Sequence, residues 1–354
     1  MAPKVFYLGG FHTICNMRNI AVIDLRVLKS NAENIKSNLP NGVKFCAVVK
    51  ADGYGHGGVE VASALYSIVD SFAVALVEEG VALRLAGIDK EILTLIPVKG
   101  KALKIAVRYS LSVTVDDFST LLAVYRESLE QKKKVKIHLA FNTGMNRFGF
   151  DESLEIEKAI DFIKDKKEII LEGFYSHLSE PENDIELKKA VDKFLVAKKI
   201  VKSYNNKVTC HISASGGFIK GEYHDMVRIG IMLYGYYPFN YNQMVKVSPV
   251  MKIYSQVIKN RRLKKGDKVG YGKFRLKADK KVSLIRYGYA DGLFRKNRSP
   301  FINDRCMDVT AINGTKARYH KVMFDAKKLA EEYDTISYEI LVRATARSEK
   351  IYIR

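Results

Sequence analysis

The sequence predicts an α/β protein in which an N-terminal (β/α)8 TIM barrel precedes a mainly β domain. Strand-like runs of apolar and β-branched residues alternate regularly with amphipathic, helix-like segments. Eight such runs occur, at residues 43–49, 72–76, 92–96, 112–115, 135–141, 171–176, 208–212 and 227–231. Past Tyr241 the strand-like runs are separated by short turns rich in Gly, Asp and Asn. The count of alternating units fits a barrel better than an open doubly wound sheet.

The same pattern divides the chain into three segments. Residues 1–18 form a lead, for which packing with the β domain is one option. Residues 19–240 form the predicted barrel domain, which begins with a short strand at 20–25 and a helix that ends at Pro40. Residues 241–354 form the predicted β domain, with strands at 250–258, 268–271 and 281–285 and a single helix near 325–332.

Composition and charge narrow the class of protein. The chain has 354 residues, of which 47% are hydrophobic and 28% are charged, as in soluble globular proteins. No apolar run reaches the roughly 18 residues that a membrane span needs, so no membrane partner is expected. The net charge of +20 comes from scattered lysines without interleaved aromatic residues, which favours a solvated basic surface over nucleic-acid binding. A cleft in this protein should still attract anionic ligands such as phosphates.

The cysteines indicate a reduced, cytoplasmic protein without a metal site. The four cysteines lie far apart, and none belongs to a CxxC pair or a metal-like cluster. Cys46 and Cys210 fall inside apolar strand patterns and are predicted to be buried thiols. The apolar start of the chain is too short and too broken by glycine to be a signal peptide.

Lys50 is the first candidate for chemistry. It ends the apolar run at 43–49 and precedes a loop that contains three glycines. Removing an ammonium group from water is costly, so a lysine at the end of a buried strand needs a reason. The residue either extends to solvent or has a lowered pKa that lets it act as a nucleophile or base.

Further polar residues follow the carboxyl ends of other predicted strands, where barrel active sites are built. They are the stretch 142–147, Ser176-His177, the turn 213–215 and the stretch 228–231. Arg228 stands between apolar residues on both sides, and the turns at 215–217 and 230–231 offer backbone N–H groups to a phosphate. A strand-end lysine, a phosphate cradle and an arginine for a ring nitrogen are what a pyridoxal 5'-phosphate (PLP) enzyme needs.

These residues resemble the signature motifs of the alanine racemases, the fold-type III PLP enzymes. The resemblance runs in order from about residue 19 to residue 340. Its motifs lie at 48–57, 142–149, 227–235, 269–272, 288–292, 306–308 and 337–339. The resemblance implies a barrel followed by a β domain, in a head-to-tail homodimer whose active sites are shared between subunits.

The resemblance also implies a role for each site residue. Lys50 would hold PLP as a Schiff base and act as one of two bases at the substrate Cα, and Tyr271 of the partner subunit would be the other. Arg228 would meet the pyridine nitrogen, and His177 would relay between Arg228 and the tyrosine. The phosphate would be bound by Tyr54, Ser215, the N–H groups of Gly230 and Ile231, and Tyr338. Arg147 and the backbone of Met307 would bind the substrate carboxylate.

Several of these residues have an ordinary structural alternative. Tyr54 and Tyr338 are also typical packing residues, and His211 is interpreted as a core or rim histidine. Asp291 and Asp308 are interpreted as turn or supporting groups rather than bases.

The sequence departs from the family near Arg147. Ala140 stands where many members carry a carbamylated lysine, and Asn142 replaces a nearby aspartate. The negative charges that would neighbour Arg147 are therefore missing, and a bound chloride or water in their place is a hypothesis. A crystal structure that shows Arg147 held firmly with neither beside it would remove that hypothesis.

The predicted function is the interconversion of L- and D-alanine by a PLP-dependent racemase. A racemase of serine, lysine or several amino acids is the first alternative, motivated by Ala140 and Asn142. A fold-type III decarboxylase is the second, and Arg228 argues against it because such enzymes need an acidic partner for the ring nitrogen.

Overall fold

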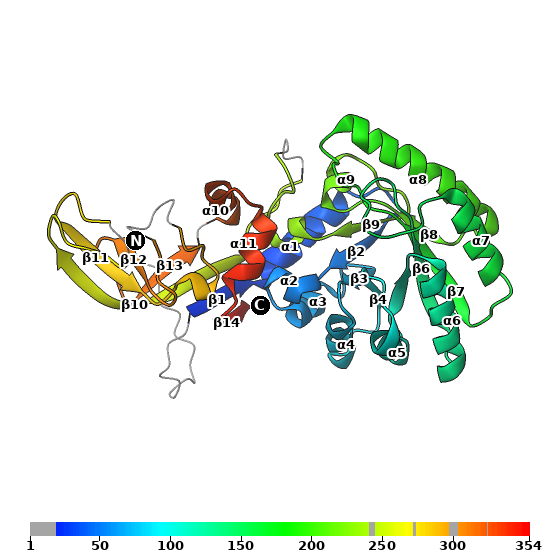
Figure 1. The fold of residues 1–354 in the computed structure, drawn as a ribbon, viewed down its shortest axis with the longest axis horizontal. Coiled ribbons are helices and arrows are strands. Elements are labelled where there is room, and N and C mark those ends of the chain that lie inside the picture. Colours follow the sequence, from blue (N-terminus) through cyan, green and yellow to red (C-terminus); the bar gives the residue numbers. More distant parts are fainter. Residues whose placement is uncertain (1–18, 241–244, 272–273, 297–303, 324) are drawn as a thin grey trace. The chain divides into compact units, whose positions relative to one another are not determined.

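The computed structural model describes residues 19–240, 245–271, 274–296, 304–323 and 325–354 (Figure 1). The chain forms two compact units. One comprises Ile23–Met251, Ile336–Val342 and Tyr352–Arg354, and the other comprises the residues up to Val22, Lys252–Thr335 and Arg343–Ile351. The predicted lead at 1–18 and its packing lie outside the described residues, and the predicted domain boundaries stay a proposal.

The first unit is built on an eight-stranded parallel sheet with the order β8-β7-β6-β5-β4-β3-β2-β9. Its strands are β2 (Lys44–Val48), β3 (Ser71–Val74), β4 (Glu91–Thr94), β5 (Ser112–Val115), β6 (Val135–Ala140), β7 (Ile169–Tyr175), β8 (Thr209–His211) and β9 (Met226–Ile229). The end strands are joined by backbone bonds from Asp225 to Cys210 and from Arg228 to Ser213, of 3.0 and 2.9 Å. The predicted barrel is therefore confirmed, and all the predicted barrel strands form.

Helices follow the barrel strands, as the alternating pattern predicts. They are α3 (Gly58–Leu65), α4 (Val77–Leu85), α5 (Gly100–Arg108), α6 (Phe118–Gln131), α7 (Ser153–Ile163), α8 (Asp184–Tyr204) and α9 (Ser215–Ile219), and α1 (Leu25–Ser37) precedes β2. Side chains of Asp24, Asp117 and Asn183 accept bonds from N–H groups in the first turns of α1, α6 and α8. The short helix α2 (Lys50–Tyr54) and the 3-10 helix η1 (Ile231–Tyr234) begin directly at predicted site residues.

The second unit contains a six-stranded sheet with the order β12-β11-β10-β1-β14, and β13 pairs with β10. Its strands are β1 (Asn19–Asp24), β10 (Met251–Leu263), β11 (Lys280–Ile285), β12 (Thr310–Asn313), β13 (Tyr319–Met323) and β14 (Ser348–Ile353). A small core of Val269, Leu276 and Val282 packs with this sheet. The strand predicted at 20–25 thus belongs to the β sheet and lies outside the barrel.

Two predictions for the second domain are wrong. Residues 268–271 form no strand, because Gly270 takes a φ of 69° and Lys268 makes only an isolated bridge with Arg275. The expected single helix is α10 (Ala326–Tyr333), but a second helix, α11 (Ser337–Ala344), follows it. The helical turn η2 (Tyr289–Asp291) is also present.

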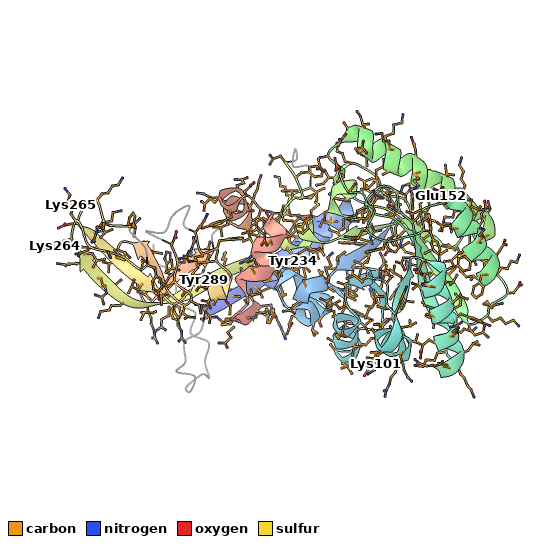
Figure 2. The ribbon with its side chains drawn as sticks, viewed as in Figure 1. Lys101, Glu152, Tyr234, Lys264, Lys265 and Tyr289 are labelled. Carbon is orange, nitrogen blue, oxygen red and sulfur yellow. The ribbon has the colours of Figure 1, made fainter. Side chains whose placement is uncertain are left out.

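The surface agrees with a solvated distribution of charge. Figure 2 shows Lys101 on α5, Glu152 beside the start of α7 and the adjacent Lys264 and Lys265 just after β10, and all of them are exposed. Cys46 and Cys210 are buried free thiols, as predicted. Among the described residues, no helix has the length and apolar character that crossing a membrane requires.

Candidate active site

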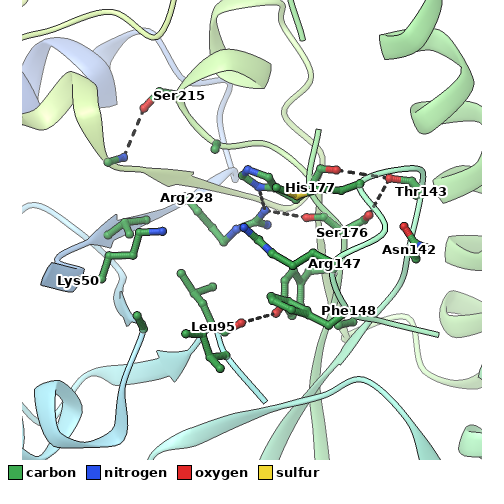
Figure 3. Close-up of a pocket in the computed structure, with 18 of the residues that line it drawn as sticks. Lys50, Leu95, Asn142, Thr143, Arg147, Phe148, Ser176, His177, Ser215 and Arg228 are labelled. Atoms are coloured by element: carbon green, nitrogen blue, oxygen red, sulfur yellow. Dashed lines mark hydrogen bonds between the residues drawn. The ribbon is translucent and has the colours of Figure 1, made fainter. Parts of the chain in front are cut away.

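A cavity of about 350 Å³ opens at the carboxyl ends of the barrel strands. It gathers every predicted site residue except Tyr271 and Met307, namely Lys50, Tyr54, Arg147, His177, Ser215, Arg228, Gly230, Ile231 and Tyr338. Figure 3 labels Lys50, Arg147, His177, Ser215 and Arg228 around this cavity. Tyr271 and Met307 belong to the other compact unit, where they are 68% and 52% exposed. Residues at or after the carboxyl ends of β2, β6, β7, β8 and β9, together with Tyr338 of α11, therefore meet in one hollow, as the barrel fold predicts.

Lys50 is presented by a strained turn. Ala51, Asp52, Gly53 and Tyr54 all have positive φ angles, between 52° and 60°, which L residues rarely adopt in succession. The Glu79 carboxylate accepts a 2.6 Å bond from the N–H of Ala51, and Asp52 accepts a 2.8 Å bond from the N–H of Gly58. Sequence reasoning missed Glu79, because an acidic residue in the first turn of a helix is common and its partner Ala51 lies far away in the sequence. These two bonds hold the turn that presents Lys50.

The Lys50 side chain lines the cavity, which decides between its two interpretations (Figure 3). Burial lowers the pKa of Lys50, and repulsion from Arg147 lowers it further. A lysine that simply extended to solvent would show neither effect. The geometry therefore favours a nucleophile or base.

Gly230 and Ser215 form a cradle at one end of the cavity. The N–H of Gly230 donates to Oγ of Ser215 over 3.4 Å, and both residues stand at the beginning of a helical turn (Figure 3). A Cβ at position 230 would collide with the hydroxyl of Tyr54, so only glycine leaves this space open. Backbone N–H groups at such turns suit a phosphate, and these residues fit the phosphate of PLP.

Two tyrosine hydroxyls border the same cradle. The rings of Tyr54 and Tyr338 lie 5.9 Å apart between centroids, and Tyr54 also packs on Tyr234 at 4.7 Å. Burial raises the pKa of Tyr54 and raises that of Tyr338 to about 12. Both hydroxyls are therefore neutral donors at neutral pH, which suits an anionic ligand. Their packing is compatible with the phosphate-binding role predicted for both residues.

Arg228 is held by several acceptors deep in the barrel. Its NH2 group donates to the carbonyls of Ser176 at 2.7 Å and Ile212 at 3.1 Å. Its NH1 group donates to Nδ1 and the carbonyl of His211. Burial lowers the pKa of Arg228 to about 10, so the guanidinium stays charged at neutral pH. His211 is fully buried, in agreement with its interpretation as a core histidine.

His177 connects Arg228 to the cavity. Its Nδ1 lies 3.4 Å from NH2 of Arg228, which can only donate. Burial lowers the pKa of His177 to about 3, and the charges of Arg228 and Arg147 contribute. The imidazole is therefore neutral, and its proton resides on Nε2.

The loop around Arg147 uses Asn142 in a way that the sequence did not reveal. Nδ2 of Asn142 donates to Asn146 at 2.9 Å and to Asp151 at 2.7 Å, and Oδ1 accepts the N–H groups of Gly144 and Asn146. Asn142 thus builds the loop that carries Arg147. The guanidinium of Arg147 stacks over Phe148, 4.6 Å from the ring centroid.

Asp291 and Asp308 act as structural groups within the second unit. Asp291 accepts the N–H of Gly288 at 2.8 Å and is bound by Arg347 at 2.9 Å. Asp308 accepts from the same arginine at 2.9 Å. These contacts match the turn and supporting roles expected of both residues.

The barrel and its lysine-arginine site define an α/β enzyme of the PLP-barrel type. Residues 23–238 match the alanine racemase N-terminal domain, and residues 250–352 match the alanine racemase C-terminal domain. The chain belongs to the alanine racemase family, which is a family of isomerases, and the resemblance is confirmed.

Individual relatives agree with this assignment. The chain is 30% identical to an alanine racemase of Lactobacillus acidophilus, over 93% of this chain and 96% of the relative. It is similar to the structure of alanine racemase from Clostridium difficile 630, with 26% identity, a TM-score of 0.91 and coverage of 96% and 97%. It is also similar to a Bartonella henselae alanine racemase with covalently bound pyridoxal phosphate, with 26% identity, a TM-score of 0.83 and coverage of 95% and 99%. Alanine racemases depend on PLP.

Proposed function

We propose that this protein is a PLP-dependent racemase that interconverts L- and D-alanine. The observation that carries the proposal is that Lys50 and Arg228 face one cavity beside the Ser215–Gly230 cradle. Membership of the alanine racemase family supports it. When bound, PLP supplies an electron sink that makes the Cα proton of an amino acid acidic.

The residues around the cavity would hold the cofactor at three places. Lys50 Nζ would attach it covalently. Tyr54, Tyr338, Ser215 and the N–H groups of Gly230 and Ile231 would bind its phosphate. Arg228 would donate to its ring nitrogen, and because a guanidinium keeps its proton, that nitrogen would stay unprotonated. The weaker electron sink should favour simple proton exchange over elimination or transamination.

Racemisation needs a proton to leave one face of Cα and another to arrive at the opposite face. Lys50 would serve one face, and its lowered pKa makes the neutral amine accessible. Tyr271 of the partner subunit would serve the other face. Neutral His177 would donate Nε2–H to the side-chain oxygen of that tyrosine.

Substrate binding would use Arg147 and the backbone N–H of Met307 on the carboxylate. Asn142 holds the loop beside Arg147, and Ala140 leaves space at the cavity wall. Chloride or water near Arg147 remains our hypothesis for the missing negative charges. A racemase of another amino acid is the alternative that Ala140 and Asn142 motivate.

The dimer, the location and the domain limits are part of the same proposal. Because the second base is proposed to be Tyr271 of the partner subunit, the active form would be a homodimer with shared active sites. The reduced cysteines support a cytoplasmic location. The domain boundaries at 18, 240 and 354 are those of the sequence pattern.

A racemisation assay on purified, PLP-loaded protein tests the function. A panel of L-amino acids should show alanine as the best substrate, with D-alanine formed from L-alanine and the reverse. Faster turnover of serine or lysine would replace alanine as the substrate. Release of CO2 without racemisation would support the decarboxylase and refute the racemase.

A further inference from the structure

Four side chains form a continuous hydrogen-bonded chain that starts at Arg228 and leads away from the cavity. The Arg228 guanidinium contacts Nδ1 of His211. Nε2 of His211 lies 3.0 Å from Nδ1 of His138, and Nε2 of His138 lies 3.0 Å from Oε1 of Glu91. Strands β9, β8, β6 and β4 each contribute one member, so the hydrogen-bonded chain of side chains crosses the barrel interior.

The donors and acceptors of this chain can run in one direction only. Arginine has no acceptor, so Nδ1 of His211 must accept and its proton must reside on Nε2. That Nε2–H donates to Nδ1 of His138, which places the proton of His138 on Nε2 as well. His138 then donates to the Glu91 carboxylate, which only accepts. Both histidines are therefore neutral Nε2–H tautomers between a fixed cation and a fixed anion.

The fold makes room for this chain at Gly173. Gly173 pairs with His138 between β6 and β7, where the register shifts. A Cβ at position 173 would overlap the imidazole of His138. Glycine weakens the interior of a strand, so its use here has a packing reason. Gly173 makes β7 less stable but leaves space for the imidazole ring of His138.

Glu91 is the anionic end of the chain. It begins β4, whereas Arg228 lies near the end of β9, so the two charges stand toward opposite ends of the barrel. Oε1 of Glu91 also accepts from Ser112 at 2.8 Å, and a second cavity, of about 270 Å³, reaches both residues. Burial alone would raise the pKa of Glu91, but the hydrogen bonds from His138 and Ser112 and the nearby Lys136 ammonium lower it. Glu91 is thus ionised at neutral pH.

Arg228 needs such a countercharge because its direct acceptors are neutral. They are the carbonyls of Ser176, His211 and Ile212 and the two imidazoles. A buried cation is expensive without a compensating anion. Two neutral rings polarised toward Glu91 supply part of that compensation across the barrel.

We propose that Glu91, acting through His138 and His211, is a positioning residue that orients and electrostatically supports Arg228 from the far end of the barrel. The inference rests on the proposed function, because Arg228 is taken to meet the cofactor ring nitrogen there. None of the three residues touches the cofactor or the substrate in this scheme.

Nitrogen NMR of the PLP-loaded protein with labelled histidine tests the chain without using activity. His138 and His211 should both give the signals of neutral Nε2–H tautomers, assigned with the variants His138→Gln and His211→Gln. A protonated ring or an Nδ1–H tautomer at either position would overturn the inference. The NMR signals report on the hydrogen-bonded chain even if the protein does not racemise alanine. A failure of the proposed function can therefore be distinguished from a failure of this inference.

The variant Glu91→Gln keeps an oxygen that can accept from His138 and removes only the charge. The hydrogen bond from His138 would then end on a neutral oxygen, so Arg228 would lose electrostatic support. This change should lower kcat for alanine by about tenfold, with little change in KM. The pH profile of kcat should shift, and the signals of both histidines should move. Glu172→Gln is the matched control, since Glu172 pairs with Lys136 at 3.0 Å and stands outside the chain.

The variant Gly173→Ala perturbs the same hydrogen-bonded chain at a position on the neighbouring strand β7. It should displace His138 and reproduce the kinetic change of Glu91→Gln while Glu91 itself is intact. If Gly173→Ala does not fold, Glu91→Gln decides alone. Unchanged kinetics in Glu91→Gln, or an equal loss in Glu172→Gln, would refute the role of Glu91.

Discussion

Arg228 donates a hydrogen bond from NH2 to Nδ1 of His177 across 3.4 Å, which leaves Nε2 of that ring as the donor toward the cavity. The proton of His177 is thus assigned by an arginine that cannot accept. A ring next to two guanidinium groups resists protonation, and this has a consequence for stability as well as for chemistry.

The first prediction concerns acid sensitivity. Burial lowers the pKa of His177 to about 3 and that of His224 to about 4, and it lowers that of His211 as well. Below about pH 6.5 these histidines bind protons in the unfolded chain but stay neutral in the folded chain. The free energy of unfolding is therefore greatest above that pH and decreases as the pH falls. At pH 5 each of these histidines should lower the free energy of unfolding by about 1 to 2 kcal/mol. Urea unfolding between pH 7.5 and 5 measures this, and His177→Asn should reduce the slope. An equal slope in that variant would contradict the assignment.

The second prediction concerns Lys50. The holoprotein should be yellow, and borohydride should change its absorbance because the cofactor is attached to Nζ. Lys50→Ala should lose activity by at least about a thousandfold, since both the attachment point and one base are gone. Lys101→Ala, which changes an exposed lysine on α5, serves as the control. Substantial racemisation by Lys50→Ala would show that another residue carries the reaction.

The third prediction concerns Tyr271. Tyr271→Phe removes the hydroxyl and should slow one direction of proton transfer more than the other. Solvent deuterium uptake from each enantiomer of alanine measures the two directions separately. Equal losses in both directions, with deuterium uptake unaffected, would argue against two bases.

The fourth prediction concerns the phosphate cradle. Gly230→Ala places a methyl group where the Tyr54 hydroxyl lies, so the tyrosine or the backbone must move. Overpacking of this kind should weaken PLP binding by about ten- to a hundredfold. Absorbance titration of the cofactor-free protein measures the affinity, and circular dichroism verifies the fold. A Kd close to that of the parent protein would mean that the phosphate binds elsewhere.

The fifth prediction concerns Asn142. Asn142→Asp does not restore a brace for Arg147, because the new carboxylate would face the Asp151 carboxylate that Asn142 now binds at 2.7 Å. Loss of these bonds should destabilise the loop by about 1 kcal/mol and raise KM for alanine. The double variant Asn142→Asp with Asp151→Asn exchanges donor and acceptor and should recover much of the loss. A lower KM in the single variant would show that the added charge does help Arg147.

Much of the barrel and most of the cavity could be predicted from the sequence. Buried parallel strands are continuous apolar runs, and a charge such as Lys50 or Arg228 interrupts them visibly. The pairing of β1 with β10 could not be predicted, because it joins distant segments. Helix α11 was missed because its apolar and β-branched residues also suit a strand.

The supporting carboxylates were the other omission. Glu79 and Glu91 lie near the start of a helix and a strand, where charged residues are common. Their partners are Ala51 and His138, which are far from them in sequence. Only the folded chain brings each pair together, so residue type and spacing carry no signal for either.

Tyr338 enters the barrel unit from helix α11, more than a hundred residues after the last barrel strand. A fragment cut after the barrel would keep Lys50 and Arg228 but lose one hydroxyl from the phosphate cradle. Cofactor affinity should therefore report whether synthesis of the chain has reached α11. A product truncated before α11 should therefore retain PLP weakly, whereas one that includes α11 should retain it firmly.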